Sequence, residues 1–215
     1  PLGSLDDLPW LDRSVFPHVL YHTQPDPWPM DGYCGWGPGP RVLTTMISRG
    51  CPFTCKFCYP AERQHYQQIR RRSVGSVLGE LMMAHARWGP ANSLVFHDAE
   101  WYMKKTWLEE FLERYPRETP RWLFWAAGRA DMILKWPELF RAIVMDAGWQ
   151  FVSIGLESGS DRVLNILGKG VTRAENDAAI DLINEIGDEQ VRRGQPPVRI
   201  WANLMQAIPG EERED

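Results

Sequence analysis

The chain has 215 residues, a hydrophobic fraction of 44% and a formal net charge of −4. This length is typical of one sizeable domain, and this composition is typical of a soluble globular protein. No run of residues approaches the apolar length of a membrane span, and the mild charge supports neither a membrane nor a nucleic acid as a general partner.

The N-terminal part of the chain carries little regular pattern. Residues 1–4 look like a protease-cleavage and cloning scar and are left out of the predicted fold. Residues 5–40 are rich in Pro, Gly and aromatic residues, which predicts an irregular, packed lead-in. We therefore expect the core domain at residues 41–215. The absence of a secretory signal peptide from this sequence predicts a cytoplasmic location.

A short apolar run over residues 41–48 predicts the first strand, and Cys51, Cys55 and Cys58 follow it directly. Three thiolates on one loop can hold three irons of a [4Fe–4S] cluster and leave the fourth iron open to a small molecule. Cys34 lies far upstream beside Gly residues and is a poor candidate for the missing ligand. Disulfides are disfavoured, because cysteines this close together reach disulfide geometry poorly. Zinc stays the alternative, although zinc sites usually bring two separated Cys/His pairs.

After the cysteines, predicted strands alternate with predicted helices. Helical spacing of apolar residues predicts one helix after Ser73, a second around Trp107, a third that begins at Pro137 and a fourth over residues 161–167. A fifth helix opens on a capping box formed by Thr172 and Glu175 and is expected to end near Gly187 or Gly194. The remaining strands are predicted at residues 93–97, 121–127, 150–156 and 198–208.

Five strands that alternate with helices imply right-handed βαβ units and a parallel sheet, so the predicted class is α/β. The regular recurrence is typical of a closed or open barrel, in which the chemistry gathers at the carboxyl ends of the strands. The chain ends with residues 211–215, where a sixth unit would begin. We therefore expect a core that is truncated after its fifth strand.

The spacing C-x3-C-x2-C, with the aromatic Phe57 just before the last cysteine, resembles the radical S-adenosylmethionine (SAM) enzymes, and this resemblance makes Phe57 a candidate SAM-binding residue. In that family the open iron binds the amino and carboxylate groups of SAM, and one electron from the cluster cleaves SAM to a 5′-deoxyadenosyl radical. The resemblance implies a partial (β/α)6 barrel, an oxygen-sensitive cluster and an electron donor such as flavodoxin or ferredoxin. The protein would supply orientation, a dry cavity and control of the radical.

The resemblance also implies roles for polar residues after the second and third strands. Asp98 and Glu100, with His97 beside them, occupy the place of a motif that contacts the amino group of SAM, although the usual Gly-Gly-Glu form is missing. A buried ammonium group needs such acceptors. The alternative for Asp98 is an N-cap of the next helix. Arg129 could pair with the SAM carboxylate through a two-pronged bond, and its alternative is an ion pair with Asp131.

The fourth strand ends in a second motif, Gly-Leu-Glu-Ser-Gly-Ser over residues 155–160, followed by Leu-Gly-Lys over residues 167–169. Glu157 and Ser158 are therefore candidate SAM-binding residues, with Glu157 as a polar anchor for the ribose or methionine part. The alternative for Ser158 and Ser160 is that they cap the next helix. The pattern resembles radical SAM proteins that also bind cobalamin and their relatives that install methylthio groups.

Three further segments extend this second resemblance. Residues 206–211 resemble the Gly-x-Pro-Gly-Glu turn of those proteins, with Gln206 in place of the first Gly. Residues 8–17 resemble the linker that joins an upstream cobalamin domain to their barrel. Residues 70–73 resemble the stretch before their first helix. We therefore expect a radical SAM enzyme, and within that family a cobalamin-type methyltransferase whose cobalamin is held by a domain outside this chain. The alternatives are a methylthiotransferase, which would need a second three-cysteine cluster, and a non-catalytic Fe–S or zinc-binding module. The substrate is left open.

Overall fold

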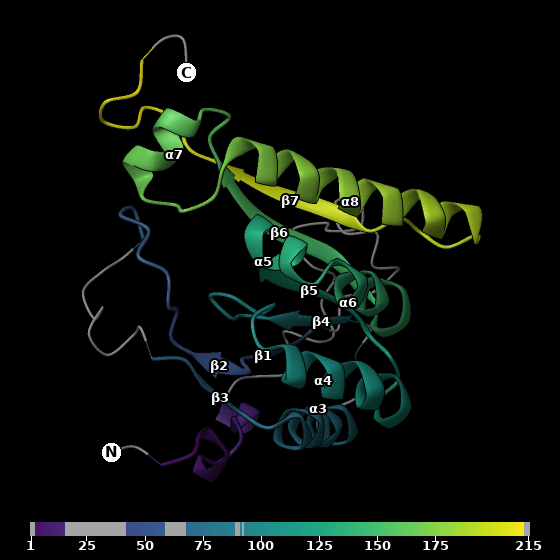
Figure 1. Ribbon diagram of the computed structural model, residues 1–215. Coiled ribbons are helices and arrows are strands. Elements are labelled where there is room, and N and C mark those ends of the chain that lie inside the picture. The colour runs from purple at the N-terminus through teal and green to yellow at the C-terminus, as the bar shows by residue number, and fades with distance from the viewer. Residues whose placement is uncertain (1–2, 16–41, 59–67, 89–90, 92, 213–215) are drawn as a thin grey trace.

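The computed structural model describes residues 3–15, 42–58, 68–88, 91 and 93–212. Five parallel strands form one sheet in the order β1-β4-β5-β6-β7, which is also their order along the chain (Figure 1). The strands are β1 (Val42–Thr45), β4 (Ser93–Phe96), β5 (Leu123–Gly128), β6 (Trp149–Glu157) and β7 (Arg199–Leu204). This confirms the predicted α/β class, and the sequential order is the one expected when right-handed crossovers curl a sheet toward a barrel.

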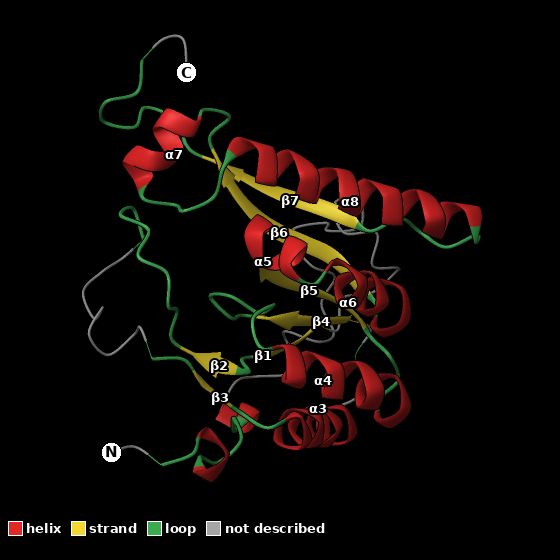
Figure 2. Ribbon diagram, in the orientation of Figure 1, coloured by secondary structure: helices red, strands yellow, loops and turns green. Residues whose placement is uncertain are grey.

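Helices connect the strands, with β7 and α8 at one edge of the sheet and β1, α3 and α4 at the other (Figure 2). Two short helical turns, η1 (Leu5–Asp7) and η2 (Arg13–Val15), precede the sheet. The main helices are α3 (Val74–Trp88), α4 (Lys105–Glu118), α5 (Ala130–Lys135), α6 (Pro137–Ala142), α7 (Asp161–Leu167) and α8 (Arg173–Arg192), and a π-helical turn, η3 (Ile143–Ala147), follows α6. In the described part of the chain, no helix combines the length and apolar character needed to cross a membrane.

Several helix boundaries follow the sequence signals. Ser73 Oγ accepts a hydrogen bond from Ser76 N at 3.1 Å, as an N-cap does. Pro137 occupies the first turn of α6, and the capping box of Thr172 and Glu175 opens α8. Of the two expected ends of α8, the one near Gly194 is confirmed and the one near Gly187 is wrong, because the helix continues to Arg192 and the chain then turns at Gly194, where φ is 70°.

The first predicted strand is shorter than expected. Of residues 41–48, Arg41 lies outside the described residues, and the sheet strand β1 ends at Thr45. Ser48 begins a separate antiparallel ribbon, in which β2 (Ser48–Arg49) pairs with β3 (Arg70–Arg71). The chain leaves the sheet here because Asp98 accepts hydrogen bonds from the backbone N–H groups of Ile47 and Ser48.

Other corrections concern elements near the strand ends. Helix α5, which follows β5 directly, was not predicted. The strand predicted at residues 121–127 is β5, which begins two residues later than expected; Arg121, before it, has a φ of 56°. Of the strand predicted at residues 198–208, only residues 199–204 form a strand, β7. Asp98 does not cap the next helix, since α4 begins at Lys105 with Lys104 at its N-cap. The interior of the lead-in and Cys34 lie outside the described residues.

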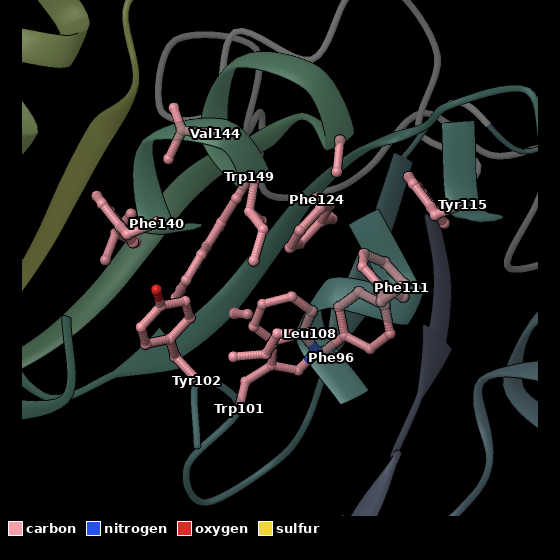
Figure 3. Close-up of a cluster of buried hydrophobic side chains, with 14 of the residues drawn as sticks. Phe96, Trp101, Tyr102, Leu108, Phe111, Tyr115, Phe124, Phe140, Val144 and Trp149 are labelled. Carbon is pink, nitrogen blue, oxygen red and sulfur yellow. The ribbon is translucent and has the colours of Figure 1, made fainter. Parts of the chain in front are cut away.

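The core lies between the sheet and its helices and is dominated by aromatic side chains (Figure 3). Burial alternates along β5, where Phe124, Ala126 and Gly128 are buried and their neighbours are partly exposed. Trp101 is fully buried, and its ring centroid lies 5.0 Å from that of Trp149 and 5.3 Å from that of Phe124. Trp101 follows β4 directly, so the same short segment anchors the core and carries Asp98 and Glu100.

Candidate functional site

The three cysteines lie on the loop that follows β2. Cys51 is half-buried, Cys55 is buried and Cys58 is exposed, and none of the three is in a disulfide within the described residues. Gly50 has a φ of 103°, a left-handed conformation that favours glycine and turns the chain into the loop. Burial raises the pKa of the Cys51 thiol, and the negative charges of Glu100, Cys58 and Cys55 raise it further. The three thiols therefore lie within electrostatic reach of one another.

Two contacts hold the far side of this cysteine loop, residues 51–58, against later parts of the chain. The backbone N–H of Lys56 donates to the carbonyl oxygen of Leu167, the last residue of α7, at 2.8 Å. Arg129 Nη1 donates to Cys55 Sγ at 3.5 Å. The cysteine loop is therefore docked on the segments that follow β5 and β6.

Asp98 fixes the entrance to the cysteine loop. Its carboxylate accepts hydrogen bonds from Ile47 N at 3.1 Å, from Ser48 N at 2.6 Å and from the Ser48 hydroxyl. Burial raises the pKa of Asp98, and the bonds from Ser48 and Ile47 oppose that effect. Both oxygens thus serve the backbone between β1 and β2, and the contact of Asp98 with the SAM amino group stays a prediction.

Glu100 is a buried carboxyl group that forms no ion pair with another residue in the described part of the chain. It is 3% exposed, and its Oε1 accepts a hydrogen bond from Tyr102 N at 3.0 Å. Burial raises the pKa of Glu100 to about 8, although the positive charges of Arg129 and Lys169 act in the opposite direction. The negative charge of ionised Glu100 also contributes to the raised pKa of the Cys51 thiol.

Arg129 follows β5 and is held on several sides. Its Nε and Nη2 donate to the two carboxylate oxygens of Asp131 at 3.0 and 3.3 Å, and Nη2 also donates to the carbonyl oxygen of Lys169 at 2.8 Å. The guanidinium carbon lies 3.6 Å from the ring centroid of Phe53, a cation–π contact within the cysteine loop. The ion pair with Asp131, which was the alternative reading, is present. A bond from Arg129 to the SAM carboxylate stays a prediction.

Glu157 ends β6 and forms a buried ion pair with Lys169, whose Nζ lies 2.9 Å from Glu157 Oε1. Glu157 has a φ of 65°, a left-handed conformation that is uncommon for a residue with a side chain and costs of order ~1–3 kcal/mol. The ladder to β7 shifts register between Gly155 and Glu157. A Cβ at position 155 would come within 3 Å of Glu157 Oε1 and Lys169 Nζ, so a larger residue there would displace the ends of these two side chains.

The remaining predicted residues have looser surroundings. Phe57 is 38% exposed, and Lys169 Nζ lies 5.7 Å from its ring centroid. Ser158 Oγ accepts from Ser160 N, and Ser160 Oγ accepts from Val163 N at the start of α7, so the capping alternative holds for Ser160. His97 is exposed. The roles of Phe57 and Ser158 in SAM binding stay predictions.

A cavity of about 480 Å³ lies to one side of this site, between the N-terminal segment and β1. Apolar side chains of that segment line it, together with His97, Arg49 and the Arg72–Glu80 pair. Because none of the cysteines lines this cavity, it is not the place where their chemistry would occur.

Two site residues were missed from the sequence. Lys169 was noted only as part of a motif, yet it is 7% exposed and holds both Glu157 and, through its carbonyl oxygen, Arg129. Phe53 stacks on Arg129. A buried glutamate at a strand end needs a cation, and the nearby Lys169 was the available signal for it.

A [4Fe–4S] cluster fits these residues by the chemistry of its donors, since three thiols share one loop and influence one another electrostatically. In the part of the chain that the structure describes, no three His, Cys, Asp or Glu side chains are gathered around a point where a single metal ion could bind. The thiolates of a cube sit at separate corners and lie farther apart than the ligands of one ion. The choice of a cluster over zinc therefore stays a prediction from the cysteine spacing.

Comparisons with known proteins agree with this geometry. A protein named an uncharacterized methyltransferase, from Pyrococcus horikoshii, is 30% identical over 159 residues, which are 74% of this chain and 33% of that protein. The solved structure of the cobalamin-dependent SAM radical enzyme OxsB superposes with a TM-score of 0.62 at 23% identity and covers 76% of this chain and 24% of that one. The radical SAM methyltransferase TsrM from Kitasatospora setae gives a TM-score of 0.58 at 17% identity, over 76% of this chain and 30% of that one.

The chain thus spans a quarter to a third of the length of these relatives. The model of the radical SAM superfamily matches residues 45–192, a stretch that includes the cysteine loop, Asp98, Glu100, Arg129 and Glu157. This match extends over more than half of the chain, and the chain therefore belongs to the radical SAM superfamily.

Proposed function

We propose that this chain is the catalytic core of a radical SAM enzyme, in which Cys51, Cys55 and Cys58 ligate a [4Fe–4S] cluster. The observation that carries the proposal is the cysteine loop itself, with three thiols docked at the carboxyl ends of the parallel strands. The bound cluster and SAM would supply one-electron cleavage of SAM to methionine and a 5′-deoxyadenosyl radical.

The residues around the loop would bind and orient SAM. Glu100 is a buried acceptor beside the thiols, and the methionine ammonium is a cation that would satisfy its charge. Glu157, at the end of β6, would accept from the ribose or methionine part of SAM while Lys169 holds its side chain in place. Asp98 would act indirectly, by fixing the backbone that leads into the cysteine loop.

For the subgroup, we propose a cobalamin-type methyltransferase that acts on an unactivated carbon. Support comes from the Gly-Leu-Glu-Ser-Gly-Ser motif and from the relative that is named a methyltransferase. No residue of this chain is proposed as a cobalamin ligand. The proposed partners are SAM, a low-potential electron donor such as flavodoxin or ferredoxin, and a substrate that the site does not identify.

The test is anaerobic reconstitution of the full-length protein, followed by iron and sulfide analysis and absorption spectroscopy. We expect about four irons and four sulfides per chain from the cluster type, and 5′-deoxyadenosine when SAM and dithionite are added. Zinc without iron, or an intact cluster that never cleaves SAM under reduction, would contradict the proposal. The cobalamin content of the same preparation tests the subgroup separately.

A further inference from the structure

Arg129 contacts a thiol that the proposed function assigns to iron. Its Nη1 donates to Cys55 Sγ at 3.5 Å, and both residues are buried, at 7% and 8% exposure. Water therefore competes poorly with this N–H···S bond. A guanidinium is always charged in proteins, so the bond brings a positive charge to the sulfur.

The direction of this bond is set by the fold. Asp131 accepts from two nitrogens of the guanidinium, the Lys169 carbonyl accepts from one of them, and the Phe53 ring covers its face at 3.6 Å. These partners come from the start of α5, the turn before α8 and the cysteine loop. A guanidinium held in this way has little freedom to turn away from Cys55.

We propose that Arg129 is a positioning residue that raises the reduction potential of the cluster through its bond to Cys55, and that Asp131 limits this effect. The inference rests on the proposed function, because it requires Cys55 to be a cluster ligand. Hydrogen bonds to the sulfurs and the local net charge are established determinants of iron–sulfur potentials.

The signs follow from the charge change on reduction. One electron from the reductant converts [4Fe–4S]²⁺ to [4Fe–4S]¹⁺, so negative charge on the cluster and its thiolates increases. The Arg129 cation and its N–H stabilise the more negative state and favour reduction. The Asp131 carboxylate offsets part of that positive charge and disfavours reduction. Arg129→Gln should therefore lower the potential, and Asp131→Asn should raise it.

This pair of opposite signs separates tuning from a merely structural role. Both substitutions remove the same ion pair, so a loosened loop would affect the cluster in the same direction in both variants. The net charge next to Cys55 becomes more negative in Arg129→Gln and more positive in Asp131→Asn, so an electrostatic effect has opposite signs in the two variants. Arg114→Gln is the matched control, because Arg114 pairs with Glu110 and Glu118 on the exposed face of α4.

The experiment is a dithionite titration of the full-length reconstituted protein at controlled potential, with the reduced cluster followed by electron paramagnetic resonance. In Arg129→Gln we expect the ratio of reduced to oxidised cluster at a fixed potential to fall by roughly tenfold, which is about 59 mV for one electron. In Asp131→Asn we expect this ratio to rise, and in Arg114→Gln we expect no change.

Equal potentials in all proteins, or shifts of the same sign in the Arg129 and Asp131 variants, would overturn the inference. If Arg129→Gln failed to assemble a cluster, Asp131→Asn alone would decide, with a raised potential in support and an unchanged or lowered one against. A wild-type protein that assembles no cluster would instead overturn the proposed function. The two failures are therefore distinguishable.

Discussion

Two buried glutamates, Glu80 and Glu100, show how differently this fold treats a carboxylate. Glu80 is 2% exposed and Glu100 is 3% exposed. Glu80 lies on α3 and forms ion pairs with Arg13 at 3.0 Å and Arg72 at 2.5 Å. Glu100 accepts one backbone hydrogen bond and forms no ion pair with another described residue.

The difference teaches where a ligand is expected. The charge of Glu80 is matched within the fold, and this group ties the N-terminal segment and Arg72, the residue after β3, to α3. Glu100 has no such partner, and burial raises its pKa to about 8, so near neutral pH its carboxyl group is mostly protonated. A carboxyl group whose pKa burial shifts this far, at the end of a strand, is typical of a functional site rather than of a stabilising one.

Loss of one cysteine is the largest expected effect in the functional region. Cys55→Ala should abolish both the cluster and SAM cleavage, because two thiolates remain where three are needed. Iron analysis and the absorption spectrum measure the first, and 5′-deoxyadenosine formation measures the second. Retention of a full cluster by this variant would remove Cys55 from the ligand set.

Loss of the Glu80 charge should act on stability and leave the site's chemistry intact. Glu80→Gln leaves Arg13 and Arg72 buried without their partner, and we expect the free energy of unfolding to fall by about 3–5 kcal/mol. Chemical denaturation measures this change. Glu109→Gln is the control, because its pair with Lys105 is exposed and worth about 0.3–0.5 kcal/mol. Equal effects of the two changes would refute the structural role of Glu80.

Glu157 lies between these extremes, because its charge is matched by Lys169 but its backbone is strained. Glu157→Ala should weaken SAM binding by roughly tenfold to a hundredfold, the loss expected for a hydrogen bond to a charged group, while the cluster spectrum is unchanged. Equilibrium binding of SAM to the reconstituted protein measures the effect. An unaltered binding constant would show that Glu157, like Glu80, has a structural role and does not bind SAM.

The last effect is the pH dependence of stability that Glu100 confers. Burial raises the pKa of Glu100 from the usual 4.5 to about 8, so between these values the folded protein holds a proton that the unfolded chain has lost. The contribution of Glu100 to stability is therefore fully present below about pH 4.5 and is lost as the pH rises toward 8, at up to about 1.4 kcal/mol per pH unit. In Glu100→Gln this loss should disappear. Denaturation curves at pH 6 and pH 8 measure the loss of stability. Parallel pH profiles of the variant and the wild type would contradict the raised pKa, because they would show that Glu100 is ionised throughout this range.

Much of the architecture was predictable because it depends on local patterns. The period of apolar residues placed the sheet strands and most helices, and α7 occupies residues 161–167 as expected. The break after Thr45 was not predictable, because it depends on a carboxylate more than fifty positions away in the chain, at Asp98. Helix α5 is short and follows its strand without a linker, which left little periodicity to detect.

The sequence by itself determined the α/β class, the cysteine spacing and the polar residues at the strand ends, because periodicity and spacing are properties of neighbouring residues. Only the tertiary structure decided which of those polar residues meet. The pairing of Arg129 with Cys55, of Glu157 with Lys169 and of Asp98 with the backbone before the cysteine loop depends on how parallel strands bring distant loops to one edge. That juxtaposition separates the matched charges, which hold the loop, from Glu100, a buried carboxyl group that forms no ion pair with another described residue.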